Sequence, residues 1–419
     1  MRSSLASSIT AKSSESRARA WAVWLIAATF YLAAFYVRVS PAVMTGELMR
    51  DLRIGATELG YLSAFYYYAY VAMQFPTGVL VDRLGPRRLL TAGAIAAAAG
   101  TLLFSLSDSF ALACLARAIM GGSTAIGWVI TLKLATTWFP RRLFATLTGV
   151  SLFIGNMGAL FAQVPLRVMV EAFGWRAVGM GTAAFIAAVC FLAWAVVRDS
   201  PPGGLAAPVR AVKKQGSFRG IAPYRNTWLI FVAQGGFVGG ILSFTGLWGP
   251  TYLRTHYGIE QTAAAAVCSV MIVCWACASP LFGHLSDRMG KRKPLYAWGA
   301  LVTACGWTAL FYVPGLPLAG FIAIAALTSL ATGAVILGFA YSKESVPDQY
   351  MGTISGVINA GNMLGPMVLQ PAIGALLDRT HDFRIAFVPL IGWIALSALL
   401  ASQTRETYCR PSAGQAAIG

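Results

Sequence analysis

The sequence predicts an all-α membrane protein with twelve transmembrane helices in two pseudo-symmetric six-helix bundles. Of its 419 residues, 57% are hydrophobic and only 11% are charged, and the mean hydropathy is +0.66. A soluble domain carries roughly 45–50% apolar and 25% charged residues, so this composition excludes a soluble enzyme. A spanning helix needs about 20 apolar residues, and twelve such helices use roughly 240, which matches the hydrophobic content of the chain.

Twelve apolar runs are long enough to cross a bilayer. Lipid accepts only helices or closed barrels as spanning structures, and runs of this length without strand alternation predict helices. They fall at 20–44, 57–80, 89–107, 111–135, 146–169, 175–197, 227–252, 264–286, 294–313, 318–341, 353–376 and 384–402. The predicted organisation is therefore a tail 1–19, a bundle 20–197, a polar and basic linker 198–226, a second bundle 227–402 and a tail 403–419.

The positive charges predict the orientation. The net charge is +17, from 32 Lys and Arg against 15 Asp and Glu. Cytoplasmic loops collect Lys and Arg. With the N-terminus inside, 23 of the 32 lie on the cytoplasmic side, and Arg38 and Arg117 lie within helices. The seven on the outside are Arg50, Arg53, Arg167, Arg176, Arg254, Arg379 and Arg384. We therefore expect both termini in the cytoplasm, and we attribute the excess charge to topology rather than to nucleic-acid binding.

The two halves of the chain repeat each other. The segment Gly-Val-Leu-Val-Asp-Arg-Leu-Gly-Pro-Arg-Arg at 78–88 recurs as Gly-His-Leu-Ser-Asp-Arg-Met-Gly-Lys-Arg-Lys at 283–293. Gly-Asn-Met at 155–157 recurs at 361–363, at nearly the same offset. Membrane proteins built from such repeats bind their cargo between the repeats, near the middle of the bilayer.

The duplicated loop resembles the signature of the major facilitator superfamily, and the resemblance extends to the helix count, the halves and the linker. It implies a secondary transporter that works by rocker-switch alternating access, with this loop latching the cytoplasmic side in the outward-open state. Glycine permits a tight turn at Gly85 and close helix approach at Gly78, and Asp82 is suited to a helix N-terminus and a cation. The predicted gating residues in the loops are Gly78, Asp82, Arg83, Gly85, Arg87 and Arg88, with Asp287 and Arg288 in the second copy.

A polar stripe on the fourth helix predicts a cavity wall. Arg117, Gly121, Thr124, Trp128 and Thr131 follow one another by four, three, four and three residues, so they share one helix face. Polar groups in lipid must face protein or water. Arg117 and Gly121 resemble the superfamily's helix-4 motif, which lines the cavity, and we expect Arg117, Thr124 and Trp128 to contact the substrate.

Arg38 is the most informative residue. It lies past the midpoint of the first helix, with no acidic residue inside the hydrocarbon to neutralise it. A lone buried cation costs roughly 2.5–3.5 kcal/mol even on the lenient insertion scale, and an anionic substrate would offset that cost. The alternative is that Arg38 bonds helix carbonyls or reaches toward the external face.

An arginine at this place resembles two groups within the superfamily, the organophosphate antiporters and the organic-anion symporters. The antiporters pair it with a second arginine in helix 7, where this chain has Leu242 and Ser243. The symporters carry acids at the positions of Val37 and Thr124. Without an embedded acid or imidazole, exchange or uniport of an anion is the simpler mechanism. Carboxylated and phosphorylated metabolites both stay open as substrates.

Further polar and aromatic residues are candidates for the substrate site. Gly155-Asn156 and Asn362 resemble half of the nitrate-porter signature, but helices 2 and 8 lack the arginines of those porters. The glycines favour close helix packing. The remaining substrate-site candidates are Tyr36, Tyr67, Gln74, Gln234 and Trp248. Lys343 and Glu344, at the cytoplasmic end of helix 10, are either an inner gate or a solvated pair.

The sequence therefore predicts a transporter of a small organic anion in a bacterial inner membrane, without a cofactor or metal, and as a monomer. The alternatives are an exporter of drugs or hydrophobic metabolites and a non-transporting membrane sensor. The seven cysteines lack metal-ligand spacing and are interpreted as small hydrophobes. No constellation for catalysis lies near mid-membrane, so we expect no enzyme activity.

Overall fold

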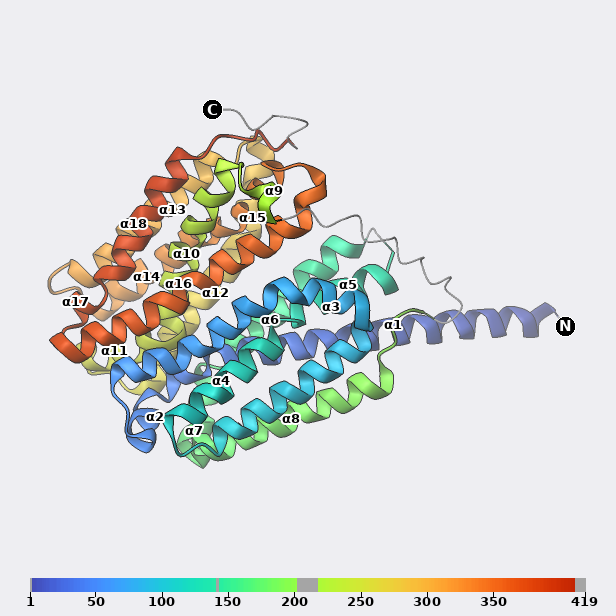
Figure 1. Ribbon diagram of the computed structural model, residues 1–419, viewed down its shortest axis with the longest axis horizontal. Helices are drawn as coiled ribbons and strands as arrows, with labels where there is room; N and C mark the ends of the chain where they lie inside the picture. Colours follow the sequence, from blue (N-terminus) through green and yellow to red (C-terminus); the bar gives the residue numbers. More distant parts are fainter. Residues whose placement is uncertain (1, 141–142, 202–217, 411–419) are drawn as a thin grey trace.

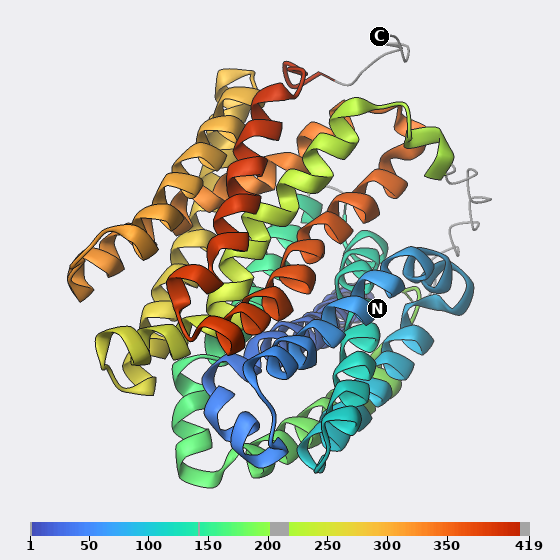
Figure 2. The ribbon, with the colours of Figure 1, turned by 60° about the vertical axis from the view of Figure 1, so that its left-hand side comes forward.

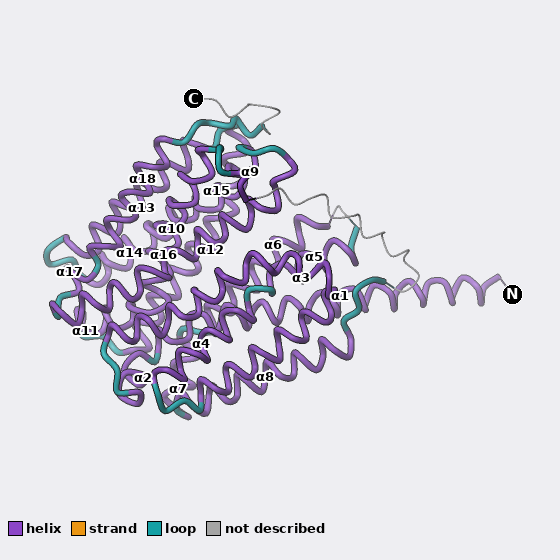
Figure 3. The backbone as a smooth tube through the Cα atoms, in the orientation of Figure 1, coloured by secondary structure: helices purple, strands orange, loops and turns teal. Residues whose placement is uncertain are grey.

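The computed structural model describes residues 2–140, 143–201 and 218–410, and within these ranges the regular structure is entirely helical (Figure 3). The predicted all-α class is thus confirmed. Most of the predicted linker, with Arg210, Lys213 and Lys214, and the end of the C-terminal tail lie outside the described residues. The assignment of the linker and of the two tails stays a prediction.

The elements of the N-terminal half are given for its described residues, 2–140 and 143–201. They are α1 (Arg2–Val39), η1 (Ser40–Val43), α2 (Thr45–Leu52), α3 (Ala56–Ser105), α4 (Phe110–Thr124), α5 (Gly127–Trp138), α6 (Phe144–Phe161), α7 (Val164–Phe173) and α8 (Trp175–Val196). Figure 1 shows α1 projecting beyond the bundle at its N-terminal end.

The C-terminal half has the same plan. Its elements are α9 (Phe218–Ile221), α10 (Arg225–Ser243), the π-helical turn η3 (Phe244–Trp248), α11 (Gly249–Tyr257), α12 (Gln261–Met289), α13 (Lys293–Tyr312), α14 (Leu318–Thr332), η4 (Gly333–Ile336), α15 (Leu337–Glu344), η5 (Asp348–Tyr350), α16 (Met351–Thr380), α17 (Phe383–Ala386) and α18 (Val388–Gln403).

Ten segments of the described chain are long and apolar enough to span a membrane. They are Ala18–Val43, Pro76–Ser105, Phe110–Trp138, Thr146–Phe173, Trp175–Val196, Arg225–Tyr257, Gln261–Met289, Leu318–Glu344, Met351–Thr380 and Phe383–Gln403. The two other predicted spans, 57–80 and 294–313, are helical within α3 and α13 but do not meet this criterion. Twelve spans therefore stay a prediction, while ten are supported by length and composition.

Glycine turns join neighbouring helices at the duplicated loops. Gly85 interrupts α3 with φ +78°, and Gly290 ends α12 with φ +64°. Only glycine adopts this backbone region at low cost. The predicted tight turn at Gly85 is confirmed, and its counterpart in the second half adopts a positive φ as well. Gly283, the counterpart of Gly78, has no atom within 4 Å of where a Cβ would stand, so it makes no close helix contact here.

Glycines also bring the repeated Gly-Asn-Met segments close to the first helix of each half. A Cβ at Gly158 would collide with the carbonyl oxygen of Leu32, so α6 and α1 touch through their backbones. In the second half, a Cβ at Gly361 would lie 2.6 Å from the carbonyl oxygen of Phe231, which brings α16 against α10. The prediction that these glycines permit close helix packing is confirmed.

The two halves hold each other at one end of the molecule. Helix α16 of the second half lies alongside α3 of the first (Figure 1 and Figure 2). Among the described residues, the hydrogen bonds between the halves lie close to α2, η1 and η3 or to the C-terminal end of α16. We call this the α2 end, and we call the opposite end, with the turns at Gly85 and Gly290, the Gly85 end.

The glycine contact between α1 and α6 predicts the effect of adding a single methyl group. We expect Gly158→Ala to lower the stability by about 1–3 kcal/mol, because two backbones must move apart to admit the methyl. Gly149→Ala is the matched control on the same helix, where a Cβ meets nothing within 4 Å. The thermal unfolding midpoint in detergent measures both, and an equal midpoint for the two variants would contradict the packing described.

Candidate functional site

Arg38 lies one residue before the end of α1, in a box of aromatic rings. The residue is 4% exposed. Its guanidinium carbon lies 4.4 Å from the ring centre of Phe35, 5.0 Å from that of Tyr70 and 5.8 Å from that of Tyr66. In the described part of the chain, Arg38 forms no ion pair, and its Nε has no hydrogen-bond partner. The charge is therefore buried and not neutralised.

The rings offset only part of the cost of that burial. A cation over an aromatic face gains roughly 0.5–2 kcal/mol, depending on its desolvation. Because an uncompensated cation in the membrane interior costs roughly 2.5 kcal/mol or more, an anion that reaches the guanidinium would gain the remainder. The side chain of Arg38 forms no hydrogen bond with a described residue. The structure therefore does not support the alternative in which Arg38 bonds helix carbonyls.

Arg117 makes the carbonyl bonds instead. This residue is fully buried in α4, and its terminal nitrogens donate to the carbonyl oxygens of Val37 at 2.6 Å and of Arg38 at 3.2 Å. Pro41 explains the arrangement, because proline has no N–H to donate to the carbonyl four residues earlier, that of Val37. Arg117 and the hydroxyl of Ser40, which donates to the same oxygen at 3.2 Å, replace the missing donor at the end of α1. Its predicted contact with the substrate stays a prediction, whereas its observed contact is with the backbone beside Arg38.

Helix α3 connects the two arginines. The hydroxyl of Tyr66 lies 2.6 Å from Oγ1 of Thr124 and donates to the carbonyl oxygen of Ala34 at 3.2 Å. A Cβ at Gly121 would collide with the backbone of Tyr66, so glycine is required for α4 to lie this close to α3. Trp128 packs against Tyr31, with ring centres 5.4 Å apart. Thr124 and Trp128 thus contact rings of the aromatic cluster around Arg38, and their predicted contact with the substrate stays a prediction.

The second half contributes neutral polar groups. Gln370 in α16 donates from Nε2 of its side chain to the carbonyl oxygen of Leu242 at 3.2 Å. The backbone carbonyl oxygen of Gln370 accepts a hydrogen bond from Nε1 of Trp248 at 3.0 Å. Gln234 donates to the carbonyl oxygen of Val335 at 3.1 Å. The side-chain oxygens of Gln234, Gln370 and Asn362 are buried and have no partner among the described residues.

The halves meet at η3, close to Arg38. A Cβ at Gly246 would lie 3.6 Å from Val39, 3.7 Å from Nε2 of Gln370 and 3.9 Å from the hydroxyl of Tyr67. Gln163, at the junction of α6 and α7, donates to the carbonyl oxygen of Thr245 at 3.0 Å and leaves its Oε1 without a described partner. Gln163 and Gln370 were missed by the sequence reasoning. Their only signal was a glutamine inside an apolar run.

Several predicted ligands form no described contact with Arg38 or the rings around it, and Gln234 and Asn362 are among them. Tyr36 lines a groove of about 590 Å³ on the flank of the first half, which is formed by α1, α6, α7 and α8. It stands two residues from Arg38, and such residues face different sides of a helix. Gln74 and Asn156 are half-buried and form no hydrogen bond with the described residues. Their role in substrate binding stays a prediction.

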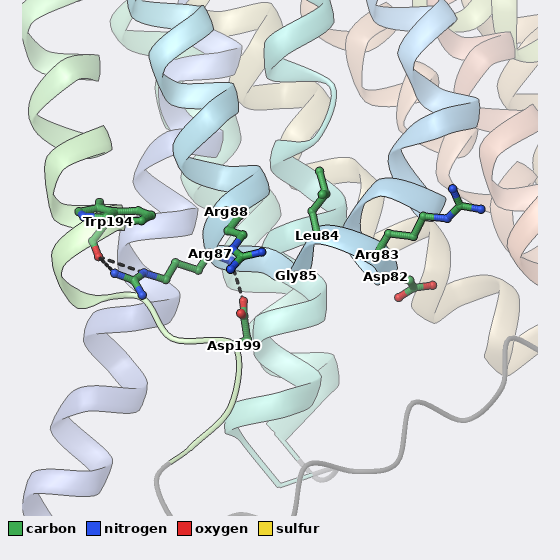
Figure 4. A pocket seen from close by; sticks show the side chains of 8 residues that line it. All are labelled: Asp82, Arg83, Leu84, Gly85, Arg87, Arg88, Trp194 and Asp199. Carbon is green, nitrogen blue, oxygen red and sulfur yellow. Dashed lines mark hydrogen bonds between the residues drawn. The ribbon is translucent and has the colours of Figure 1, made fainter.

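The first duplicated loop forms a pocket of about 400 Å³ at the Gly85 end (Figure 4). Arg87 donates to the carbonyl oxygen of Trp194 at 2.7 Å, and its backbone N–H donates to Asp199 at 2.8 Å. Asp82 pairs with Lys133 of α5 at 3.0 Å, so the predicted cation partner is present. Arg83 and Arg88 are exposed. These bonds lie within the first half, and no bond between the described residues joins this loop to the second half, so the predicted latch stays a prediction.

The second duplicated loop is held by Arg292, which the sequence reasoning did not single out. Arg292 pairs with Asp287 at 2.7 Å and with Glu344 at 2.8 Å. Burial opposes its charge, but hydrogen bonds to Glu344 and Asp287 raise the pKa of Arg292 overall. Glu406 caps α13 by accepting from the backbone N–H of Arg292 at 2.9 Å. Glu344 is thus paired with Arg292 rather than with Lys343, and the gate at these two residues stays a prediction. Arg288 is exposed.

Asp378 closes the α2 end. Its carboxylate, in α16, accepts from the backbone N–H groups of Ala56 at 3.0 Å and Thr57 at 2.7 Å, and from the hydroxyl of Thr57 at 2.6 Å. The first N–H groups of a helix have no partner inside it, and a carboxylate is the favoured acceptor. The second half thereby caps α3 of the first.

Comparisons with known proteins agree with this architecture. The model of the Major Facilitator Superfamily matches residues 23–277 and 237–408. A probable sulfoacetate transporter of Cupriavidus necator is 24% identical, and the alignment covers 88% of this chain and 90% of that transporter. A probable galactarate/D-glucarate transporter of Escherichia coli is also 24% identical, and the alignment covers 87% of this chain and 89% of that transporter. A probable nitrate/nitrite transporter of Mycobacterium tuberculosis is 26% identical, and the alignment covers 86% of this chain and 89% of that transporter.

A solved structure shares the fold. The bacterial homologue of the human lysosomal transporter Spinster, in an inward-facing and unoccupied conformation, superposes with a TM-score of 0.77. The superposition covers 94% of this chain and 99% of that one at 17% sequence identity.

The cap at Asp378 predicts how the balance between conformations responds to its removal. We expect Asp378→Ala to shift the population away from the state closed at the α2 end by about 1–2 kcal/mol, roughly five- to thirtyfold, because α3 loses its acceptor. Spin labels at positions 84 and 285 stand one in each half at the Gly85 end, and electron paramagnetic resonance measures the distance between them. Because the Gly85 end closes when the α2 end opens, we expect the variant to show a larger fraction of short distances. Asp382→Ala, which removes a cap only within α17, is the control, and an unchanged distance distribution in Asp378→Ala would contradict the role of the cap.

Proposed function

Because this chain belongs to the Major Facilitator Superfamily, whose model matches most of its length, we propose that it moves a small organic anion across a bilayer by alternating access, with Arg38 binding the charge. The chain is a membrane transporter and not an enzyme. The single observation that carries the anion is the buried, unneutralised guanidinium of Arg38. The names of the three relatives, which specify sulfoacetate, galactarate or D-glucarate, and nitrate or nitrite, support an anionic cargo.

The membrane orientation follows from the positive charges. Because Lys and Arg concentrate at the Gly85 end, we place that end and both termini in the cytoplasm of a bacterial cell, with the protein in the inner membrane. The halves are bonded at the α2 end, so this conformation faces inward. The fold shared with an inward-facing transporter supports this assignment. We expect the protein to act as a monomer.

Proton coupling finds no support in the site. In the described part of the chain, no carboxylate or imidazole contacts Arg38 or Arg117, and the acids of the first half with bonded partners lie at helix ends or in loops. A carrier without a titrating group beside its cargo has no residue that binds a proton together with it. Exchange of one anion for another, or uniport, is the mechanism that these residues support.

An exporter of drugs or hydrophobic metabolites is the second candidate. The aromatic rings around Arg38, and the fully buried Tyr66 and Tyr67, suit an apolar cargo. A neutral or cationic drug would leave the charge of Arg38 without a partner, which disfavours this candidate. No contact among the described residues supports a non-transporting sensor.

Exchange in proteoliposomes tests the proposal. Vesicles loaded with a panel of unlabelled carboxylates, sulfonates and phosphate esters should take up the labelled form of at least one of them. We expect Arg38→Gln to reduce this exchange by about a hundredfold or more, because a buried charge-assisted bond contributes several kcal/mol. Arg50→Gln, an exposed arginine in α2, is the control. A protonophore should leave exchange unchanged.

Two results would contradict the proposal. Equal exchange by wild type and Arg38→Gln would remove Arg38 from the site. Uptake of drugs but of no anion would make the exporter the working hypothesis.

A further inference from the structure

We infer that the groove on the flank of the first half binds an acyl chain of a membrane phospholipid, in the leaflet at the α2 end. The groove has a volume of about 590 Å³, lies between α1, α6, α7 and α8, and is lined in part by Tyr36. It is separate from the proposed anion site and does not depend on it. Its lining, its position, its length and its width each indicate a hydrocarbon occupant.

The lining of the groove is almost entirely apolar. None of the lining residues is charged, and the hydroxyl groups of Tyr36 and Thr182 are their only polar side-chain groups. Thr182 donates its hydroxyl to the carbonyl oxygen of Val178 at 2.9 Å, and Tyr36 is hydrogen-bonded to Thr182. Both hydroxyls therefore have partners inside the protein, and the lining offers no cation to an anion. Water does not fill an apolar cavity either, because it finds no polar partners there.

The groove opens toward the lipid. Phe173 and Phe161, which both line it, are 71% and 52% exposed. In a membrane protein, such rings on a spanning bundle face hydrocarbon, where water is absent. The groove is thus continuous with the lipid-facing surface of the first half. A void beside packed side chains forfeits van der Waals contacts, and acyl chains are the molecules at hand to restore them.

The length of the groove matches one leaflet. Its lining extends over positions 165–173 of α7 and 177–185 of α8. At 1.5 Å per residue each stretch measures about 12 Å, and half of the hydrocarbon core measures about 15 Å. Trp175, between the two stretches, donates from Nε1 to Asp51 of α2 at 2.9 Å. The groove therefore begins at the α2 end and extends toward the middle of the bilayer.

The width of the groove suits a chain rather than a helix. An apolar cavity of about 150 Å³ admits benzene, so a groove of about 590 Å³ has room for roughly 20 carbon atoms. Spread over about 12 Å, this volume gives a mean cross-section of about 50 Å², whereas a helix about 10 Å across has roughly 80 Å². A helix of a second copy would therefore lie over the groove without filling it.

An acyl chain in the groove completes the packing of α7. Gln163 precedes α7 with φ −99° and ψ −110°, which are not helical, so α7 is a separate helix of 10 residues. On one side α7 contacts α12 of the second half, and the groove separates another side of α7 from α1 and α8. The chain supplies the contacts that α7 lacks on the side of the groove.

Crosslinking from a phospholipid tests the inference on the purified full-length protein. Phosphatidylethanolamine with a diazirine in the middle of one acyl chain is added in equimolar amount to protein in a mild detergent. After irradiation, peptide mass spectrometry maps the adducts. We expect the adducts to concentrate on the groove, at residues such as Tyr36, Met169 and Phe173.

Gly181→Leu fills the groove and should displace the chain. A Cβ at Gly181, which lines the groove, meets no described atom within 4 Å, so the leucine side chain can enter without a clash. Each buried methylene contributes about fourfold to affinity, so the displacement of two or more should lower the adduct yield about tenfold or more. Gly392→Leu in α18 is the matched control, because a Cβ there also meets no described atom within 4 Å. It should leave the yield on the groove unchanged.

Three results would overturn the inference. Adducts spread evenly over exposed apolar residues of both halves, including Trp298 and Leu327, would show a lipid annulus without a site. An unchanged yield on the groove in folded Gly181→Leu would exclude the groove as the site. A lipid-free dimer in native mass spectrometry that Gly181→Leu dissociates would assign the groove to a second copy. If Gly181→Leu does not fold, the adduct map of the wild type decides alone.

Discussion

The charge of Arg38, buried without a counter-ion, is the constraint on which the site depends. It sits where α1 ends, because Pro41 removes the donor that the carbonyl of Val37 would otherwise receive. Arg117 and the Ser40 hydroxyl donate to that carbonyl instead, and Arg117 also bonds the carbonyl of Arg38 itself. Tyr66 lies over both guanidinium groups and is itself held by Thr124. Arg117 thus holds the backbone, whereas the side chain of Arg38 forms no described hydrogen bond, and neither guanidinium has a carboxylate partner among the described residues.

The rest of the fold places this charge at a joint between two packed units. Glycine contacts bring α6 against α1 in the first half and α16 against α10 in the second. The halves then meet at η3 and at the start of α3, where Asp378 supplies the cap. Because these contacts lie at one end, the other end can separate without breaking either half. Alternating access requires that the contacts within each half persist while the contacts between the halves form at one end and break at the other.

Much of this could be predicted from the sequence, and the limits have physical causes. The turn at Gly85 and the glycine contacts followed from the repeat, because glycine has few other reasons to recur at a fixed offset. The partner of Arg117 did not follow, because it depends on a carbonyl whose helical N–H donor is removed by a proline 76 positions before Arg117. Gln163 and Gln370 are single polar residues in apolar runs, and only the packing shows that their oxygens lack donors. Tyr36 lines a groove on the flank of the first half, because residues two apart on a helix face different sides, and its role in substrate binding stays a prediction.

The most direct test of the central claim observes the Arg38 guanidinium itself. Nuclear magnetic resonance of protein labelled with ¹⁵N-arginine detects each Nε–H, and comparison with Arg38→Lys assigns the signal of Arg38. The account predicts a signal that exchanges slowly with water in the free protein, because the group is buried without a partner, and that shifts when a transported anion is added. A shift of other arginine signals while that of Arg38 stays unchanged would contradict the claim that this residue binds the anion.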